Sequence, residues 1–273
     1  MPADQREMVA AVFDRAADTY DDIGVEFFRP IAERLVTELA PCAGERALDV
    51  GCGRGAVLFP LARAVGPDAK VVGIDLAPRM VAATRADAAR AGLAVDVRVG
   101  DAQAPDCEAQ SFDVVASSLV LFFLPDPNSA LRAWRSLLVP GGRVGVSTFG
   151  EYTPAWHAVD DVFAPFMPER MADPRSRQAQ SAFGSDAAVE ALLMDAGFVA
   201  VRTATMTVPV RFDDEDHWYR WTWSVGQRRM WEAVPPDARA EVRATAYERL
   251  DRCRDAAGRI GFDQVVRFTL GHR

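Results

Sequence analysis

The stretch Leu48-Asp49-Val50-Gly51-Cys52-Gly53-Arg54-Gly55 decides the fold of this chain. An apolar strand runs into three glycines at alternate positions, and an apolar helical stretch follows. Glycine lets the backbone turn sharply and approach a ligand without a Cβ in the way. The following helix points its free N–H groups and its positive dipole end at the turn. The stretch therefore predicts a strand–turn–helix unit that binds a nucleotide-like cofactor.

Two kinds of cofactor fit these glycines. Gly51, Gly53 and Ala56 satisfy the G-x-G-x-x-A pattern of dinucleotide-binding turns. Asp49 precedes them by two residues, and a carboxylate there would repel a pyrophosphate but attract a cationic amino group. The carboxylate favours the amino-acid end of S-adenosylmethionine. The alternative of a tight turn without a ligand would not need glycine at three alternate positions.

The composition excludes several classes of function. The 273 residues include 39 acidic and 31 basic side chains, which gives a formal net charge of −8. Nucleic-acid-binding proteins usually carry a basic stripe, and we find none, so no nucleic-acid partner is expected. The four cysteines form no C-x-x-C pair. We therefore predict no zinc site, no redox pair and no metal ligands.

The sequence also lacks the signals of a membrane protein. The N-terminal segment is charged and amphipathic, without the apolar core of a signal peptide. A run of about 18 apolar residues, as a spanning helix needs, does not occur. We expect a cytoplasmic protein with reduced cysteines and no membrane partner.

The first half of the chain alternates between strand and helix patterns. The expected strands cover 46–50, 70–74, 94–99, 112–117 and 143–148, and the expected helices cover 25–40, 56–65, 78–91 and 128–138. Pro60 lies inside the second of these helices and should kink it or cost a hydrogen bond. The alternation predicts a parallel, doubly wound sheet. Residues 1–44 would form an N-terminal helical cap, and 45–150 the cofactor-binding core.

The last third of the chain has a different organisation. A helix is expected over 185–196 and strands over 198–208 and 262–270, which would complete a mostly parallel sheet of seven strands within a single α/β domain over 1–273. Two further helical segments, 151–184 and 213–257, interrupt this pattern. They are candidates for lid inserts that contact a substrate.

With these elements in place, the chain resembles the class I S-adenosylmethionine-dependent methyltransferases, and most of all their ubiquinone/menaquinone-biosynthesis branch and its bacterial natural-product relatives. The resemblance is strong over about residues 10–150 and rests on the order of elements elsewhere. The segments that carry it are FDRAADTYD (13–21), LDVGCGRG (48–55), GIDLAPRM (73–80), GDAQ (100–103), FDVVASSLVLFFLPD (112–126) and LLVPGGR (137–143).

The resemblance implies roles for the residues that end the first three strands. Gly51, Cys52 and Gly53 would form the cofactor turn. Asp75 ends the second strand, where a carboxylate can accept both ribose hydroxyls; the alternative is an acid that interacts with a helix dipole. Leu76 follows it in the same segment.

Further cofactor contacts follow from the same resemblance. Met80 should pack on the adenine ring. Asp101 should accept a hydrogen bond from the adenine amine, or else be an ordinary loop aspartate, and Ala102 leaves space for the ring. Tyr20 should donate to the cofactor carboxylate, or else simply end a helix. Ser117 ends the fourth strand and should offer its backbone carbonyl near the cofactor amine.

Two departures from the family pattern bear on the substrate. The family often has a histidine before the Leu-Pro-Asp segment, whereas this chain has Phe122-Phe123, which predicts a more apolar pocket floor. The chain also lacks an Asn-Pro-Pro-Tyr type of motif, which disfavours methylation of a base nitrogen.

The two inserts are rich in aromatic residues, which suggests a lipophilic or ring-bearing substrate. The alternative is that these side chains pack the lid helices onto the core. The substrate-binding candidates are Phe28, Phe122, Phe166, Trp218, Trp221 and Arg228, of which Arg228, with Arg229, could anchor an anionic head group or could be solvated. His157 and Glu169 are the candidate bases. The acidic run 213–216 fits a helix N-terminus, with a Mg²⁺-diphosphate site as the alternative.

These features predict an enzyme that transfers a methyl group from S-adenosylmethionine to a small, largely apolar natural-product or isoprenoid-like acceptor. Methylation of an alkene carbon would use aromatic faces to stabilise a carbocation and Glu169 to remove a proton. Methylation of a phenolic oxygen would use His157 as the base. A fold relative that binds the cofactor but catalyses cyclisation is the alternative from another class, and a non-enzymatic binding protein is a third. Mg²⁺ would be needed only for a diphosphate acceptor, and the oligomeric state, including a homodimer, stays open.

Overall fold

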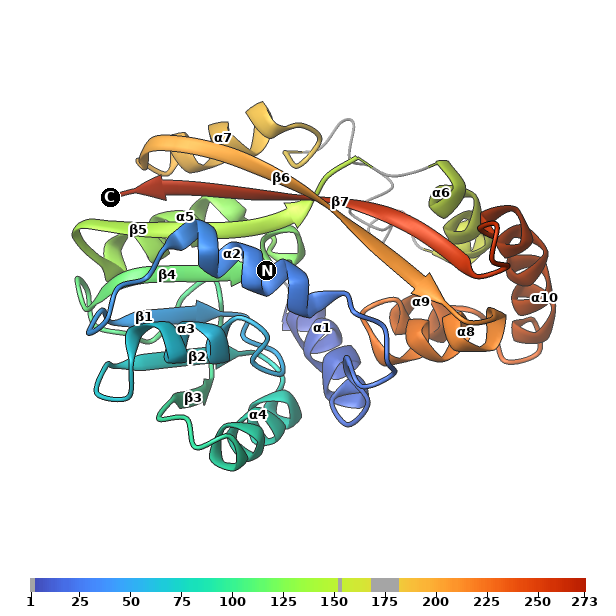
Figure 1. Cartoon of the computed structure of the whole chain (residues 1–273), viewed down its shortest axis with the longest axis horizontal. Helices are drawn as coiled ribbons and strands as arrows, with labels where there is room; N and C mark the ends of the chain where they lie inside the picture. The colour runs from blue at the N-terminus through green and yellow to red at the C-terminus, as the bar shows by residue number, and fades with distance from the viewer. Residues whose placement is uncertain (1–2, 152–153, 168–181) are drawn as a thin grey trace.

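The computed structural model describes residues 3–151, 154–167 and 182–273, and centres on a seven-stranded sheet (Figure 1). The strand order is β3-β2-β1-β4-β5-β7-β6. Strands β1 to β5 run parallel, and β7 runs antiparallel to both β5 and β6. The predicted mostly parallel, seven-stranded α/β sheet is therefore confirmed. The strands are β1 Ala47–Val50, β2 Val71–Asp75, β3 Asp96–Val99, β4 Phe112–Ser118, β5 Leu138–Phe149, β6 Val199–Phe212 and β7 Ile260–His272.

Helices cover both faces of the sheet, which explains why the central strands are apolar throughout. Side chains alternate between the faces along a strand, so Ala47 packs into the core under α2 and α3, whereas Leu48 packs into the core under α5 and α7. Helix α4 lies beside β2 and β3, and α1 packs on α4. These helices are α1 Ala3–Ala16, α2 Phe28–Leu39, α3 Leu58–Val65, α4 Pro78–Arg90, α5 Pro127–Leu137 and α7 Asp186–Asp195.

The strand order reverses direction beside β1. The chain leaves β1 toward β2 on one side, and after β3 it returns to β4 on the other side of β1. The connections after β1 and after β4 therefore diverge, and a crevice opens at the carboxyl ends of these two strands. This reversal places a candidate ligand site at the glycine turn.

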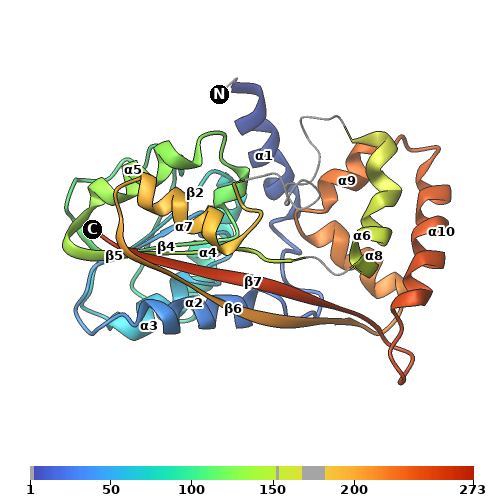
Figure 2. The same cartoon turned by 90° about the horizontal axis from the view of Figure 1, so that it is seen from above.

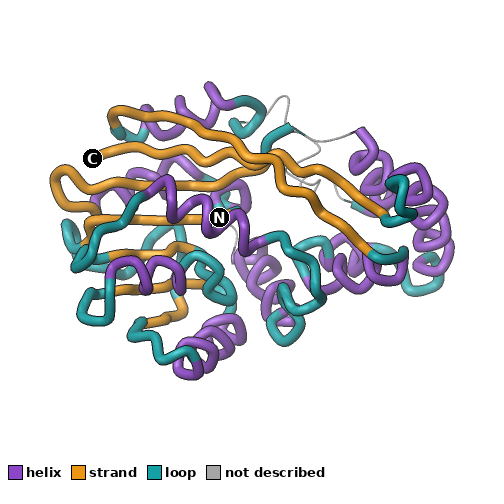
Figure 3. The backbone as a smooth tube through the Cα atoms, viewed as in Figure 1, coloured by secondary structure: helices purple, strands orange, loops and turns teal. Residues whose placement is uncertain are grey.

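A two-stranded ribbon leads from the sheet to a separate helical lobe. Pairing of β7 with β5 ends at Phe149↔Val266, whereas pairing of β7 with β6 continues to Phe212↔Ile260. Figures 2 and 3 show the two long strands running on past the sheet to the lobe. The lobe joins both predicted inserts, because α6 and η2 pack on α10 and η2 also packs on α9. Its elements are α6 Pro154–Asp160, η2 Asp161–Phe166, α8 Glu215–Ser224, α9 Arg228–Ala233 and α10 Arg239–Leu250.

The structure differs from the predicted elements in three places. Helix α3 begins at Leu58, so Pro60 lies in its first turn. The N–H groups of Phe59 and Leu61 donate to carbonyl oxygens four residues earlier, whereas Pro60 has no N–H to donate, which is the predicted cost of one hydrogen bond. Strand β5 begins at Leu138, ahead of the Pro-Gly-Gly segment, through an irregular register with β4, and β6 continues to Phe212 because it forms the ribbon. Among the described residues, none of the helices combines the length and the apolar character that a membrane span requires.

Candidate functional site

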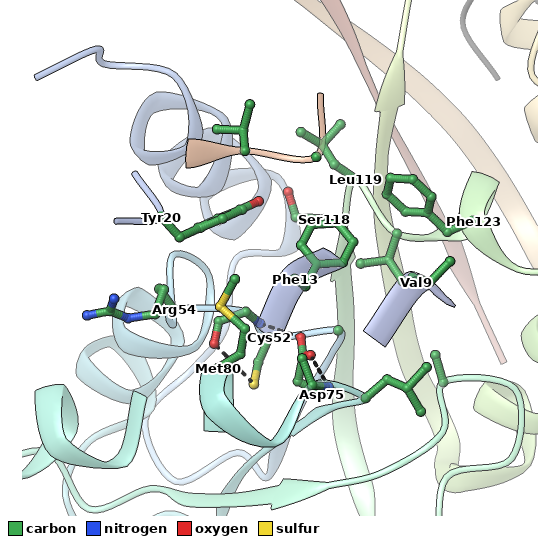
Figure 4. A pocket seen from close by; sticks show the side chains of 18 of the residues that line it. Val9, Phe13, Tyr20, Cys52, Arg54, Asp75, Met80, Ser118, Leu119 and Phe123 are labelled. Carbon is green, nitrogen blue, oxygen red and sulfur yellow. Dashed lines mark hydrogen bonds between the residues drawn. The ribbon is translucent and has the colours of Figure 1, made fainter. Parts of the chain in front are cut away.

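A single continuous pocket lies at the crevice beside β1 (Figure 4). The glycine turn and the ends of β2 and β4 form one end of the pocket. Helix α1 lies over it, and the connection from α8 to α9 closes the other end. Figure 2 shows α1 between the sheet and the lobe. The pocket therefore joins the predicted cofactor turn to the second predicted insert.

The glycine turn has the geometry that its sequence predicts. The N–H groups of Gly51 and Cys52 both donate to the carbonyl oxygen of Ile74, at 2.8 and 2.9 Å, and fix the turn to β2. Gly51 has a φ of +74°, and a Cβ there would lie 2.4 Å from a methyl carbon of Val120. Gly53 has a φ of +49°, and a Cβ there would meet no atom within 4 Å. The turn is thus packed behind Gly51 and open at Gly53, where a ligand can approach the backbone.

Asp49 lines the pocket with a buried and unsatisfied carboxylate. Its side chain is 1% exposed, and neither oxygen has a hydrogen-bond partner of normal geometry among the described residues. Burial first, and then the nearby Asp75 carboxylate, raises the pKa of Asp49 to about 8, while the Leu58 backbone N–H favours the charged form. A cationic amino group would satisfy this carboxylate, and a pyrophosphate would not.

Asp75 lies at the end of β2, where it orders the backbone and also faces the pocket. One carboxylate oxygen accepts from the Gly53 N–H at 2.8 Å, and the other accepts from the Ala77 N–H at 2.9 Å. Burial raises the pKa of Asp75, and these two backbone donors oppose the shift. Each oxygen keeps a second lone pair. The carboxylate could therefore also accept two neighbouring ribose hydroxyls.

The adenine candidates lie together on the same side of the pocket. Leu76, Met80, Asp101 and Ala102 all line it. Asp101 accepts from the Gln103 N–H at 3.0 Å, and its other oxygen lies 3.1 Å from the guanidinium of Arg6 on α1. The Trp134 indole donates to the Ala102 carbonyl oxygen at 2.7 Å, which holds this loop against α5.

Tyr20 reaches the pocket from the segment after α1 (Figure 4). Its ring centroid lies 5.0 Å from that of Phe28 and 6.1 Å from that of Phe13. Burial raises the pKa of Tyr20 well above its usual range, so the hydroxyl remains a hydrogen-bond donor. Tyr20 is positioned to donate to a ligand carboxylate.

Ser117 turns its side chain away from the pocket, and its predicted role, a backbone carbonyl near the cofactor amine, stays a prediction. Its side chain is 1% exposed, and its hydroxyl donates to the Val50 carbonyl oxygen at 2.8 Å, so it joins β4 to β1. Ser118, Leu119 and Val120 line the pocket in its place. Alternation along β4 turns the Ser117 side chain away from the pocket.

Three of the predicted substrate residues line the pocket, namely Phe28, Phe122 and Trp221. The other three do not line the pocket among the described residues. Trp218 is 1% exposed and packs on Trp231 and Tyr247, and Phe166 packs against the hydrophobic core. Arg228 pairs with Glu232 at 3.1 Å and stacks on Trp223. These side chains hold the lobe together, which is the packing alternative raised by the sequence.

One of the two predicted bases can be placed, and it does not line the pocket. His157 lies on α6 and is not among the residues that line the pocket. Glu169 lies outside the described residues. The acids at the start of α8 have other partners: Asp214 caps the helix, Glu215 pairs with Arg254, and Asp216 accepts from Tyr247. The described residues contain no group of three side chains arranged to hold a metal ion.

Sequence reasoning missed Asp21, which follows Tyr20 and lines the pocket. Its φ is +57°, a left-handed conformation that is uncommon for a residue other than glycine. Burial, with a smaller contribution from Asp22, raises the pKa of Asp21 to about 7, and Arg29 opposes the shift. Leu119, with a φ of +56°, also lines the pocket. Left-handed residues other than glycine cluster at functional sites.

Comparison with known proteins gives the family of the chain. Residues 47–142 match the family model described as a methyltransferase domain. The chain is 44% identical over 271 residues to nocamycin O-methyltransferase of Saccharothrix syringae, which covers 95% of this chain and 96% of that protein. It is 40% identical over 167 residues to aklanonic acid methyltransferase DauC of Streptomyces sp. strain C5, which covers 61% of this chain and 76% of that protein.

The fold is also found among solved structures. The YcgJ protein of Bacillus subtilis superposes with a TM-score of 0.61 at 17% identity, over 89% of this chain and 98% of that chain. Together with the glycine turn and the acids that end the neighbouring strands, these similarities define the class of protein. The chain belongs to the class I S-adenosylmethionine-dependent methyltransferases, and it is an enzyme.

Proposed function

We propose that this enzyme methylates an oxygen atom of a small, largely apolar, ring-bearing natural product. Two relatives support this assignment, since one is named for O-methylation of nocamycin and the other for methylation of aklanonic acid. They favour oxygen over carbon as the methylated atom, and methyl transfer over cyclisation.

The shape of the pocket carries the proposal. The cofactor turn and an aromatic wall line one continuous space, so an acceptor on the aromatic wall would lie next to a cofactor on the turn. Aromatic rings offer an apolar surface and prefer offset or edge-to-face contact with other rings. The wall consists of Phe27, Phe28, Phe122, Phe149 and Trp221.

The residues at the turn fit S-adenosylmethionine. When bound, this cofactor supplies a methyl group on an electrophilic sulfonium, so the protein contributes mainly binding and orientation. Asp49 would hold the amino group, Asp75 the ribose, and Tyr20 the carboxylate. Asp101 and Met80 would hold the adenine. Ordered placement of two reactants can lower a barrier by up to about 7–11 kcal/mol in ideal cases.

Asp21 is proposed to take the proton from the hydroxyl group of the substrate that is methylated. It lines the pocket, and a carboxylate whose pKa is about 7 holds and releases a proton near neutral pH. The one nearby cation that affects it in the described structure, Arg29, is already paired with Glu26. Asp21 therefore becomes the candidate base in place of His157, and Glu169 stays a prediction.

The proposed role of Asp21 predicts a selective loss of turnover. Asp21→Asn should lower kcat by about 10²–10⁴-fold while S-adenosylhomocysteine still binds. In the wild type, kcat should rise as the pH passes upward through about 7, because the ionised form accepts the proton. The variant should lose this rise. Asp22→Asn changes an exposed neighbouring carboxyl outside the pocket lining and is the matched control. It should keep kcat at high pH and keep the rise, with the midpoint moved to a lower pH because Asp22 contributes to the raised pKa of Asp21.

Product analysis tests the methylated atom. The enzyme would be incubated with ¹³C-methyl-labelled cofactor and a set of hydroxylated aromatic and polyketide acceptors, and the products examined by NMR. We expect the labelled methyl resonance of an ether or an ester. A label attached to carbon, or cyclised products without the label, would contradict the proposal.

A further inference from the structure

The buried polar groups without partners are informative because such groups are costly. A buried donor or acceptor with no hydrogen bond destabilises the folded protein, and native proteins keep few such groups. Three such side chains line the pocket, namely Asp49, Trp221 and Gln227. Asp49 lies at the cofactor turn, and Trp221 and Gln227 lie at the opposite end. The cofactor amine accounts for Asp49 and leaves the other two unexplained.

Trp221 presents a donor. Its side chain is 3% exposed, and its indole N–H has no hydrogen-bond partner among the described residues. The nearest rings are those of Phe27, Phe212 and Trp156, with centroids at 5.8, 5.3 and 6.1 Å. Aromatic rings therefore surround the indole, and none of the described residues accepts a hydrogen bond from its N–H.

Two other buried tryptophans in the described chain have an indole N–H that is hydrogen-bonded. The Trp231 indole donates to the Thr222 hydroxyl at 2.8 Å, and the Trp134 indole donates to the Ala102 carbonyl oxygen at 2.7 Å. Since both of these indoles are satisfied within the protein, the unsatisfied one on the pocket wall indicates a partner outside the chain.

Gln227 presents an acceptor. Its side-chain Nε2 donates to a carboxylate oxygen of Asp160 at 2.9 Å, and its Oε1 has no hydrogen-bond partner in the described structure. Turning the amide over would place Oε1 against the Asp160 carboxylate, so the orientation is fixed by that carboxylate. Gln227 is 5% exposed and belongs to the connection between α8 and α9.

We infer that Trp221 and Gln227 select an acceptor whose ring system carries both a carbonyl oxygen and a hydroxyl. The indole N–H donates to the carbonyl oxygen, and the Gln227 Oε1 accepts from the hydroxyl. This inference rests on the proposed function, because it places the acceptor at this end of the pocket, and it adds the two polar groups that the acceptor must bear. A hydrocarbon acceptor would leave both protein groups unsatisfied.

Binding of three related compounds to the whole enzyme saturated with S-adenosylhomocysteine tests the assignment. α-Tetralone carries the carbonyl alone, naphthol carries the hydroxyl alone, and a hydroxytetralone carries both. The wild type should bind the hydroxytetralone most tightly. Trp221→Phe should weaken the two ketones about tenfold and spare naphthol, and Gln227→Met should weaken the two hydroxyl compounds about tenfold and spare α-tetralone.

Trp218→Phe is the matched control, because it removes an indole from the same helix outside the pocket lining. It should leave all three affinities unchanged, and every variant should keep its affinity for S-adenosylhomocysteine. Equal weakening of all three compounds by Trp221→Phe or Gln227→Met would overturn the assignment, as would failure of the wild type to bind the hydroxytetralone. Because binding is measured without turnover, a negative result here is distinct from a label found on carbon.

Discussion

Asp49 has an ionisation cost that a cationic ligand would offset. Its carboxylate is buried beside a second acid, and no donor of normal geometry reaches it among the described residues. The same position would be unfavourable for a phosphate. One side chain thus separates two cofactors that the glycines alone would both accept.

The raised pKa of Asp49 predicts a pH-dependent stability of the ligand-free enzyme. The folded state keeps its proton up to about pH 8, whereas the unfolded chain loses it near 3.8. Between these values the unfolded state binds fewer protons, so this carboxyl lowers the free energy of unfolding as pH rises. Asp49→Asn should remove this pH dependence and raise the free energy of unfolding by on the order of a few kcal/mol near pH 8. Urea titrations at pH 5 and pH 8 measure the free energy of unfolding of both proteins. The same change in this free energy between the two pH values in both proteins would contradict the prediction.

The glycine turn makes a second prediction for single residues. Gly51→Ala should destabilise the protein by roughly 2–3 kcal/mol, because it combines a left-handed backbone with a clash against Val120. Gly44→Ala is the control, since Gly44 has a φ of +84° but open space around its Cβ position. It should cost only about 1 kcal/mol. Denaturant unfolding measures the stability of both variants. Equal losses of stability would show that the contact with Val120 adds no cost.

Among the elements, α1 covers the pocket and is held there by both polar and apolar contacts. Arg6 pairs with Asp101, and Arg15 pairs with Glu232 on α9. Exposed ion pairs of this kind contribute roughly 0–1 kcal/mol each. Val12 and Ala16 of the same helix are buried. We predict that this helix opens to admit the cofactor.

Cofactor binding should slow hydrogen exchange in α1. If opening of the helix releases the ligand, S-adenosylhomocysteine at 100 times its dissociation constant should slow exchange of the α1 amides by up to about 100-fold. Amides of α7, which packs on β6 and β7 away from the pocket, serve as the control and should change little. Exchange in α1 that does not respond to the ligand would show that this helix does not cover it.

Local patterns predicted the strands, the glycine turn and the acids that follow the strands, because each depends on neighbours close in sequence. The roles of Trp218 and Trp221 could not be separated in this way. Both are buried on α8, and only the packing of the lobe decides which faces the pocket. Aspartate is enriched among left-handed residues other than glycine, but the residue type alone does not show that Asp21 adopts this backbone.

In the whole molecule, the sheet and the lobe contribute opposite ends of one pocket. The sheet supplies the glycine turn, which is shared by the fold, and the β6–β7 ribbon carries the lobe, which adds Trp221 and Gln227 to the pocket. The rest of the aromatic wall comes from outside the lobe, namely Phe27, Phe28, Phe122 and Phe149. Changes in the lobe should alter acceptor choice without changing cofactor affinity.

Calorimetric titration of the whole chain with S-adenosylhomocysteine at pH 7, in buffers with different ionisation enthalpies, tests the central claim most directly. We predict one site per chain and the release of a proton, because the ligand amine favours the ionised form of Asp49, whose pKa in the free protein is about 8. Asp49→Asn should bind more weakly and release fewer protons. Binding of NAD with no binding of S-adenosylhomocysteine, or binding of S-adenosylhomocysteine with the same proton release in both proteins, would contradict it.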